Sequence, residues 1–360
     1  MRILHVITSL YNGGAERLMV DLLPRLCNDG NNEVELLLFN GVETIFKKEL
    51  QQRGIKIISL STTNDVYHPR RLFKLRSIIQ QYDIVHTHNT ACQLYVAIAS
   101  CLLRRKPLLV TTEHNSTNRR RAQAWLKPVD RWMYNRYAAI VCIAEQTRRN
   151  LINYIGDNNR LHTINNGVDV KRFVKPIGQI ANKSEFIVTM VAAFRPQKDF
   201  ETLFRAMNRL PASYRLWIVG GGDRREGERI KAYCTSLRLD DRVEFLGVRE
   251  DVPKILEKSD VIVLSSHWEG LSLSSIEGMA CGRPFIASDV DGLHDVVKGA
   301  GLLFPEGNDK ELANQIQYTC EHPDKYNKIA LQCQERALSY DISIMADNYL
   351  RLYNKMTTNR

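Results

Sequence analysis

The sequence has 360 residues, 44% of them hydrophobic and 25% charged, with a formal net charge of +10. This length and apolar content suit two domains with a core each, and nothing in the composition indicates a disordered chain. The N-terminus lacks the apolar core of a secretory signal, and no apolar run approaches the ~18 residues of a transmembrane helix, so we expect a protein that is neither secreted nor membrane-spanning.

The first half of the chain alternates short apolar runs, typical of buried strands, with amphipathic helical stretches. The strand-like runs span residues 3–8, 33–39, 56–60, 84–88, 108–112 and 140–143. This βαβ rhythm predicts a mostly parallel sheet covered by helices on both faces.

A second series of the same kind follows the turn at Asn166-Gly167. Its strand-like runs span residues 186–193, 216–219, 243–246, 261–264 and 285–288. The two series predict an α/β fold of two doubly wound, Rossmann-like domains. Because such sheets bind ligands beyond the carboxyl ends of their strands, we expect a cleft between the domains. Residues 342–355 have helical periodicity and predict a C-terminal helix.

Eight cysteines are scattered through the chain without C-x-x-C pairs or zinc-ligand spacing. Most have apolar neighbours, as buried free thiols do. We therefore expect reduced cysteines in a cytosolic protein, with neither a disulfide framework nor a zinc site.

Two carboxylates spaced E-x7-E, Glu269 and Glu277, flank a loop rich in Gly and Ser. Residues 274–281 resemble a helix stopped by Gly282, which puts Glu269 on a strand-to-helix loop and Glu277 about one turn inside the helix. Unpaired N–H groups and the positive dipole end favour anions at such a helix N-terminus. The segment therefore predicts a sugar-nucleotide site.

A structural alternative exists for the same residues. Ser274 and Glu277 also have the spacing of a capping box, in which the Glu side chain reaches back to the N-cap N–H. Glu269 can likewise be an ordinary solvated loop acid, so the motif alone leaves both interpretations open.

The order and spacing of several motifs, over nearly the full length, resemble the retaining GT-B glycosyltransferases of family 4. In that family E-x7-E precedes G-x-P and a Gly-containing turn, which are here Gly282-Arg283-Pro284 and Asp291-Gly292-Leu293. The other matching segments are Gly13-Gly14-Ala15-Glu16, His86 with His88, His114-Asn115, Asn166-Gly167-Val168-Asp169, Pro196-Gln197-Lys198-Asp199, Gly220-Gly221-Gly222-Asp223, Phe245-Leu246-Gly247 and Tyr349-Leu350-Arg351-Leu352-Tyr353.

The resemblance implies a GT-B fold with three parts. Residues 1–170 would form the acceptor-side domain, residues 171–338 the donor-binding domain, and residues 339–360 a helix that packs back on the first domain. In such enzymes Glu277 would bind the ribose hydroxyls, and Glu269, a candidate catalytic residue, would bind the donor sugar. The backbone amides that would meet the sugar or phosphate belong to Gly14, Gly270, Leu271, Ser272 and Leu273.

The resemblance also implies a cationic clamp for the diphosphate, to which Lys198 aligns without adjustment. The family's usual arginine is missing, because its position holds Ala193. Arg195 lies two residues later and would point to the same side if the segment stays extended, so it is a candidate substitute. The alternative for both cations is a solvated loop charge.

His114 ends a strand of the first domain, and the resemblance implies a catalytic place near the donor sugar or the reacting hydroxyl. A lone histidine is more often structural, and His86 and His88 compete for the role; we expect His88 to support His114. Asp289-Val290-Asp291 looks like the D-x-D metal motif of the other major glycosyltransferase fold, but it lies between a strand and a turn. We therefore expect neither a metal ion nor any cofactor beyond the nucleotide sugar.

The positive charge is concentrated in the first 170 residues, where Trp125 and Trp132 are interleaved with Lys and Arg. An anionic membrane with a lipid-linked acceptor, nucleic acid, or a merely solvated basic face can explain it. No RNA-binding signature is present, so we expect no nucleic acid. The expected membrane contact, on the cytoplasmic face, consists of Arg119, Arg120, Arg121 and Trp125, in a segment that is helical up to Lys127 and again after Pro128.

Together these features predict a metal-independent retaining glycosyltransferase. It would move a hexose or N-acetylhexosamine, with UDP the favoured carrier, to a glycan or lipid-linked acceptor in cell-surface polysaccharide assembly. The alternatives are a sugar-nucleotide epimerase or phosphorylase of the same fold, and a catalytically idle, basic membrane-surface binding protein. Ala193 keeps the last alternative open.

Overall fold

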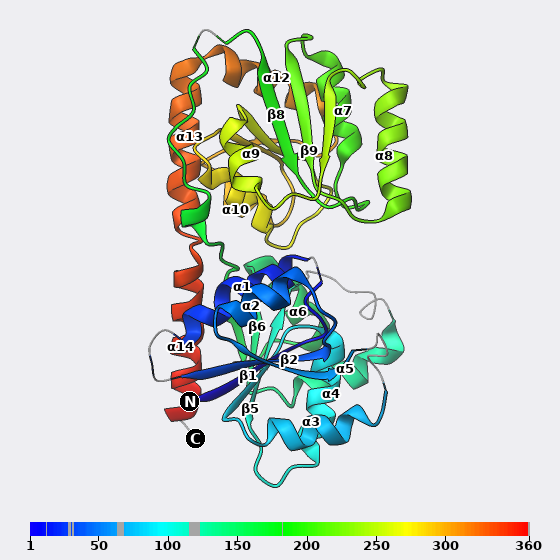
Figure 1. The fold of residues 1–360 in the computed structure, drawn as a ribbon, viewed down its shortest axis with the longest axis vertical. Coiled ribbons are helices and arrows are strands. Elements are labelled where there is room, and N and C mark those ends of the chain that lie inside the picture. The colour runs from blue at the N-terminus through cyan, green and yellow to red at the C-terminus, as the bar shows by residue number, and fades with distance from the viewer. Residues whose placement is uncertain are drawn as a thin grey trace. The chain divides into compact units, whose positions relative to one another are not determined.

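The computed structural model describes residues 1–11, 13–27, 30, 32–62, 68–114, 123–181 and 183–358. The chain divides into two compact units (Figure 1). Unit 1 comprises Met1–Gly167 and Ile342–Arg360, and unit 2 comprises Val168–Asp341. The sequence-based expectation had set these limits at residues 170 and 338.

Unit 1 is built on a parallel sheet, in which the described residues form seven strands in the order β3-β2-β1-β4-β5-β6-β7. The strands are β1 (Arg2–Ile7), β2 (Glu33–Asn40), β3 (Lys56–Ser61), β4 (Ile84–Thr87), β5 (Leu108–Glu113), β6 (Ala139–Cys142) and β7 (Leu161–Thr163). All six predicted strands are present. The short edge strand β7 was missed, because three residues give no periodic signal.

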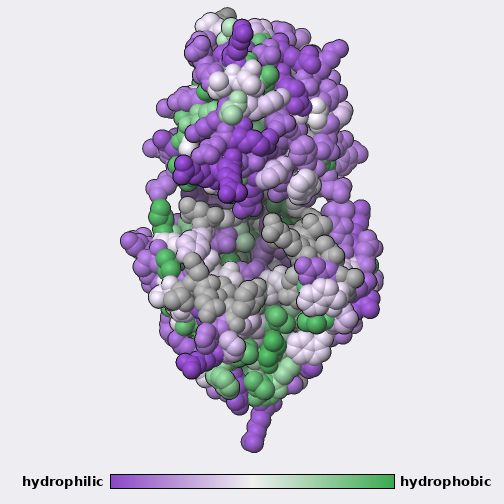
Figure 2. Space-filling model, turned by 90° about the vertical axis from the view of Figure 1, so that its right-hand side faces the viewer, coloured by the Kyte–Doolittle hydropathy of each residue, from purple (hydrophilic) through white to green (hydrophobic). Residues whose placement is uncertain are grey.

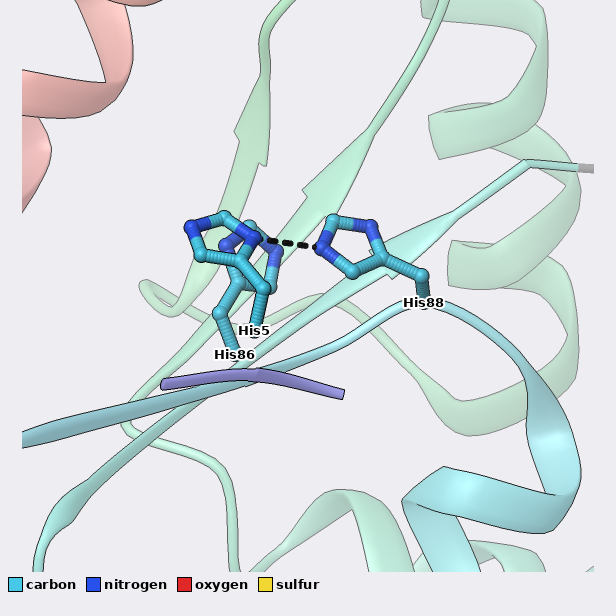
Figure 3. Close-up of side chains that lie close together, drawn as sticks. All are labelled: His5, His86 and His88. Carbon is cyan, nitrogen blue, oxygen red and sulfur yellow. Dashed lines mark hydrogen bonds between the residues drawn. The ribbon is translucent and has the colours of Figure 1, made fainter. Parts of the chain in front are cut away.

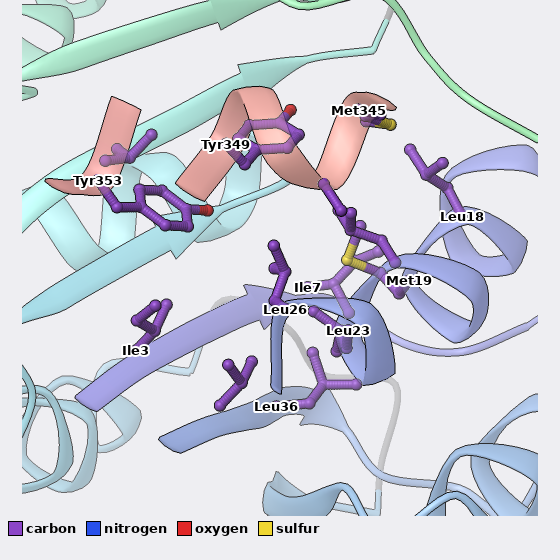
Figure 4. Packing of buried hydrophobic residues seen from close by; sticks show 14 of the residues in the cluster. Ile3, Ile7, Leu18, Met19, Leu23, Leu26, Leu36, Met345, Tyr349 and Tyr353 are labelled. Atoms are coloured by element: carbon purple, nitrogen blue, oxygen red, sulfur yellow. The ribbon is translucent and has the colours of Figure 1, made fainter. Parts of the chain in front are cut away.

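Helices cover both faces of this sheet, as the βαβ rhythm predicts. They are α1 (Gly14–Cys27), α2 (Ile45–Gln52), α3 (Arg71–Ile79), α4 (Thr90–Cys101), α5 (Lys127–Tyr134), α6 (Glu145–Ile155) and the C-terminal α14 (Ile342–Thr358). One face buries Ile3, Ile7 and Leu36 under α1 and α14 (Figure 4). The other face buries Leu4, Val6 and Val85 with residues of α3 and α4. The predicted C-terminal helix therefore completes a core of unit 1.

Unit 2 repeats the architecture with a second parallel sheet, whose described strands run in the order β10-β9-β8-β11-β12-β13. They are β8 (Phe186–Val191), β9 (Tyr214–Val219), β10 (Val243–Gly247), β11 (Val261–Leu264), β12 (Phe285–Ser288) and β13 (Leu302–Phe304). The helices are α7 (Phe200–Arg209), α8 (Arg224–Ser236), α9 (Val252–Lys258), α10 (Leu273–Ala280), α11 (His294–Val297), α12 (Asp309–Glu321) and α13 (Pro323–Leu338). In both sheets the strand order reverses beside the first strand of the unit, which is where ligands bind in doubly wound folds.

Two composition-based expectations can be compared with the structure. No helix in the described part of the chain is both long and apolar enough to cross a bilayer. The eight cysteines are unpaired thiols, and six of them are buried: Cys92, Cys142, Cys234, Cys281, Cys320 and Cys333.

Candidate functional site

Glu269 lies on the loop between β11 and α10, as predicted, and its side chain is buried. Its carboxylate accepts hydrogen bonds from Lys198 Nζ, from Ser266 Oγ at 2.9 Å and from Gln197 Nε2 at 3.0 Å. Its backbone N–H donates to the carbonyl of Asp291 at 3.2 Å. Glu269 is thus fixed at both backbone and side chain, so the alternative of a solvated loop acid is wrong.

Lys198 is buried with Glu269 because a tight turn follows β8. The backbone N–H of Lys198 donates to the carbonyl of Arg195 at 2.9 Å, and the next residue, Asp199, caps α7 by accepting from Thr202 N at 3.0 Å. A short antiparallel bridge joins Lys198 to Ser266 on the Glu269 loop. The turn and the bridge together place the ammonium against the carboxylate.

Arg195 is exposed, and Ala193 is half-buried. The N–H groups of Ala192 and Phe194 donate to Val219 and Gly221, so the segment stays extended as far as Phe194. Ala193 and Arg195 are the outward residues of that alternation, since Ala192 and Phe194 are both buried. This is the local conformation that the substitution of Arg195 for the missing arginine requires.

Glu277 occupies the fifth position of α10, about one turn from its N-terminus, as predicted. The N-cap residue of α10 is Ser272, whose side chain makes no capping hydrogen bond. A capping box built on Ser274 and Glu277 would need Ser274 as the N-cap, so that alternative is wrong. The first turn of α10 begins at Leu273, and Gly270, Leu271 and Ser272 lead into it.

The turn Asp291-Gly292-Leu293 packs against the backbone of the Glu269 loop. Gly292 has φ +81°, and a Cβ there would lie 2.1 Å from the carbonyl oxygen of Gly270. Only glycine permits this approach without displacing the loop. The Asp289 carboxylate pairs with His294 Nδ1 at 2.5 Å, and the backbone carbonyl of Asp291 accepts from Glu269 N, so this segment has structural contacts through the Asp289 side chain and the Asp291 backbone.

In unit 1, Gly14 is the first residue of α1 and is exposed. The carbonyl of Gly13 accepts the hydrogen bond from Arg17 N at 2.9 Å, so the two glycines form the entry to the helix. The expected loop-to-helix position of Gly14 is present, and it leaves the Gly14 N–H among the unpaired donors of the first turn.

Four histidines gather at the carboxyl ends of the central strands of unit 1. In the parallel register His5 of β1 faces His86 of β4. Because alternate residues of a strand share a face, His88 lies on the same side as His86, and His114 on the same side as Thr112. Figure 3 shows the rings of His5, His86 and His88 meeting at this face.

Two hydrogen-bond chains run through this histidine cluster. In the first, His5 Nδ1 is 2.8 Å from His88 Nε2, and His88 Nδ1 is 3.2 Å from His114 Nε2. In the second, His86 Nδ1 is hydrogen-bonded to the Tyr353 hydroxyl of α14 at 2.5 Å, and His86 Nε2 to Thr112 Oγ1 at 2.7 Å. Thr112 Oγ1 is in turn hydrogen-bonded to the Tyr349 hydroxyl of α14 at 2.9 Å. His86 also stacks on His88, with ring centroids 4.3 Å apart.

Burial keeps these histidines neutral. It lowers the pKa of His5 to about 3 and that of His114 to about 4. The pKa values of His86 and His88 are also well below the ordinary value, first because of burial and then because of the neighbouring histidines. At neutral pH each ring therefore carries one proton.

His5, His86 and His88 are also the group with the spacing for a metal ion, since their ligand atoms lie within 4.8 Å of one another. Hydrogen bonds already engage both nitrogens of His86 and both of His88. A metal ion would have to displace these bonds, so the geometry of the described residues fits a hydrogen-bonded cluster better than a metal centre.

Of the expected membrane contact, Arg119, Arg120 and Arg121 lie outside the described residues. Trp125 is 73% exposed on a short 3-10 helix, Ala124–Leu126, which leads directly into α5. The expected change at Lys127 and Pro128 lies slightly earlier, where the 3-10 helix ends at Leu126 and α5 begins at Lys127; Pro128 sits in the first turn of α5, where no partner for its missing N–H is needed. Trp125, Val129 and Trp132 lie on one exposed helical face, while Asp130 and Met133 are buried.

Several residues of these sites were missed by the sequence analysis. Ser266 and Gln197 hold Glu269, and His5 holds His88. His5 can be found from the expected parallel sheet, because the first strand and the fourth were assigned correctly and only their pairing and register were lacking. Nothing in the local sequence marks Ser266 or Gln197. Their roles depend on hydrogen bonds to Glu269, which lies 3 residues from Ser266 and 72 residues from Gln197 in the chain.

Comparisons with known proteins agree with this architecture. A family model described as Glycosyltransferase Family 4 matches residues 12–172, and one described as Glycosyl transferases group 1 matches residues 185–322. The chain is 28% identical to the UDP-Gal:alpha-D-GlcNAc-diphosphoundecaprenol alpha-1,3-galactosyltransferase of Escherichia coli, over 84% of this chain and 82% of that protein.

A second relative comes from Campylobacter jejuni: GalNAc-alpha-(1->4)-GalNAc-alpha-(1->3)-diNAcBac-PP-undecaprenol alpha-1,4-N-acetyl-D-galactosaminyltransferase. It is 24% identical over 98% of each chain. Among solved structures, Anabaena HepE in complex with UDP and glucose has a TM-score of 0.87 and 22% identity, over 99% of this chain and 100% of that one. Sucrose-phosphate synthase from Thermosynechococcus elongatus has a TM-score of 0.80 and 22% identity.

The two Rossmann-like units and their motifs define a glycosyltransferase of GT-B fold. The chain belongs to glycosyltransferase family 4, as its sequence motifs predicted.

Proposed function

We propose that unit 2 binds a UDP-sugar at the N-terminus of α10 and that the chain transfers the sugar, a hexose or N-acetylhexosamine, with retention of configuration. The observation that carries the proposal is the fixed Glu269 beside the first turn of α10, with Glu277 one turn further on. The UDP bound to HepE and the UDP-Gal named for the Escherichia coli relative support UDP as the carrier.

The proposed roles follow from the position of each group. Glu277 accepts hydrogen bonds from the ribose hydroxyls, and Glu269 accepts them from the sugar. The amides of Gly270, Leu271, Ser272 and Leu273 meet the sugar and phosphates at the positive end of α10. On unit 1, Gly14 presents its N–H to the donor phosphate and His114 contacts the reacting sugar.

The departing diphosphate needs positive charge as the glycosidic bond breaks. Lys198 has three N–H donors and uses one on Glu269, so it can hold the carboxylate and a phosphate oxygen together. Arg195 supplies the second charge in place of the arginine missing at Ala193. With these cations and the α10 dipole, the reaction proceeds without a divalent ion, and the phosphate accepts the proton of the attacking hydroxyl on the same face.

For the acceptor, we propose a lipid-linked glycan in cell-surface polysaccharide assembly. The names of the Escherichia coli and Campylobacter jejuni relatives both contain an undecaprenol diphosphate. The exposed face of α5 suits the cytoplasmic surface of the membrane that carries such a lipid. Trp125 and Trp132 are amphipathic anchors, and Arg136 lies over the Trp132 ring at 5.1 Å. Figure 2 looks onto the side where α5 lies and shows apolar residues gathered on unit 1.

The test measures free UDP and glycosylated product from a panel of UDP-sugars, with and without undecaprenol-diphosphate glycans. We expect UDP only when an acceptor is present, and an unchanged rate in EDTA. Isomerised donor without UDP release would establish the epimerase, and phosphate-dependent turnover the phosphorylase. Donor binding without any turnover would establish the idle binding protein. Activity that vanishes in EDTA and returns with magnesium would contradict the metal-free mechanism.

A further inference from the structure

His114 is the outermost ring of the hydrogen-bond chain His5–His88–His114 in unit 1. The chain contains three neutral rings and two ring-to-ring hydrogen bonds, so two of its three protons lie between rings. The third proton must sit at one end of the chain. It is carried either by His114 Nδ1, at the outer end, or by His5 Nε2, at the inner end.

The inner end is a poor place for a proton. His5 is fully buried, and its Nε2 has no hydrogen-bond partner among the described residues. A buried N–H without an acceptor is rarer and costlier than a buried acceptor without a donor. His5 Nε2 is therefore the bare nitrogen, which makes His5 Nδ1 a donor to His88, and His88 Nδ1 in turn a donor to His114 Nε2.

The second chain holds the first in place. His86 is stacked on His88 and lies 4.9 Å from His5 between ring centroids, and its own nitrogens are fixed by Tyr353 and Thr112. His86 therefore packs against both neighbouring rings and restrains their orientation. Because Tyr353 belongs to α14, the last helix of the chain supports the same arrangement.

We propose that His5 and His88 are positioning residues that fix His114 as the neutral tautomer with its proton on Nδ1. This inference rests on the proposed function, and it makes His114 a hydrogen-bond donor to an oxygen of the bound sugar or acceptor and not the base that deprotonates the acceptor. If the two ring-to-ring hydrogen bonds ran in the opposite direction, His114 Nδ1 would carry no proton and could act as a base. His5 Nε2 would then be a buried N–H without an acceptor among the described residues.

The direct test is ¹⁵N nuclear magnetic resonance of the full chain with labelled histidine, without substrate. The tautomer is visible from the shifts of the two ring nitrogens, and His114→Ala assigns the signals. Between pH 6 and 8 we expect His114 to show a protonated Nδ1, a bare Nε2 and no titration. A protonated Nε2, a mixture of tautomers or a charged ring in that interval would overturn the proposal. Since no turnover is measured, the result is independent of whether the transfer reaction is correct.

A matched pair of variants tests the role of His88. The side-chain amide of His88→Asn can donate from the place of Nδ1, whereas His88→Ala has no donor. We expect the His114 signature to persist in the first and to be lost in the second, with kcat at least about tenfold lower in the second and KM for the donor nearly unchanged. His5→Ala should act in the same direction as His88→Ala, and His162→Gln, outside the cluster, should change neither. An unaltered His114 signature in folded His88→Ala would refute the positioning role.

Discussion

The Lys198 ammonium donates a hydrogen bond to Glu269 Oε1, so two residues that the sequence analysis assigned to different parts of the donor are direct partners. Both side chains are buried, with exposed fractions of 9% for Lys198 and 7% for Glu269. The pair thus joins the carboxylate proposed to bind the sugar and the cation proposed to bind a phosphate in one structural element.

Removing one member of this pair should leave a buried charge without its partner. We expect Lys198→Met to lower the free energy of unfolding by about 3–5 kcal/mol, and Glu269→Gln to lower it less, because the Gln amide oxygen can still accept from Lys198 and Ser266. Turnover should fall strongly in both. The double variant Lys198→Met/Glu269→Gln should be more stable than the sum of the single effects predicts. Additive losses in urea unfolding would show that the two residues do not interact.

Glu277→Ala should weaken UDP-sugar binding while sparing the fold. Loss of charge-assisted hydrogen bonds to the ribose is worth about 1.5–3 kcal/mol, which corresponds to a tenfold to hundredfold rise in Kd. Calorimetric titration measures the affinity, and Glu228→Ala, on exposed α8, is the control for loss of a carboxylate from unit 2. The role assigned to Glu277 is incorrect if the affinity is retained.

Gly292→Ala should disturb the Glu269 loop by direct contact with its backbone. Its Cβ would lie 2.1 Å from the Gly270 carbonyl and 2.5 Å from the Glu269 carbonyl, at a φ of +81°. Gly307→Ala is a matched control, because φ is +74° there but no heavy atom lies within 4 Å of the added Cβ. Each carries a backbone strain of about 1–2 kcal/mol, so a larger loss of Tm and donor affinity in Gly292→Ala isolates the clash. Equal effects would mean that the loop adapts.

The histidine cluster should make the protein less stable in mild acid. The pKa of His114 is about 4 and that of His5 about 3 in the folded chain, against 6.5 in the unfolded chain. Below pH 6.5 the unfolded state therefore binds more protons, and stability falls as pH falls toward 4. Unfolding between pH 4.5 and 7.5 measures this slope, which should be shallower in His86→Leu. A stability maximum near pH 5 would contradict the assignment of neutral buried rings.

Membrane docking should depend on both the arginines and the exposed tryptophans. Each basic residue near an anionic surface contributes about 1 kcal/mol. We expect sedimentation with anionic but not neutral vesicles, weakened by salt, by changing Arg119, Arg120 and Arg121 together to Ser, and by Trp125→Ser with Trp132→Ser. Phe73→Ser, at another exposed aromatic of unit 1, is the control. Equal binding to both lipids would point to a soluble acceptor.

The sequence predicted the arrangement of strands and helices better than the contacts within the sites. Strand periodicity and motif order were sufficient for both sheets except the three-residue edge strands β7 and β13, and for placing Glu269 and Glu277 correctly relative to α10. The bond between Lys198 and Glu269 was not predictable, because it depends on how the turn after β8 meets the loop after β11. The capping-box alternative failed for a local reason. Helix α10 begins at Leu273, so Ser274 lies inside the helix and is not the N-cap residue that the pattern requires.

Helix α14 follows unit 2 in the sequence but belongs to unit 1, and this order has a consequence for how unit 1 folds. Unit 1 is interrupted in the sequence by the whole of unit 2, so Met345, Tyr349 and Tyr353 can join its core only after Val168–Asp341 have been synthesised. The Tyr353 hydroxyl that fixes His86 is likewise separated from it in the sequence by the whole of unit 2. A fragment of residues 1–167 alone would therefore have an open core and an unsupported histidine cluster, so unit 1 cannot be obtained by cutting the chain between the two units.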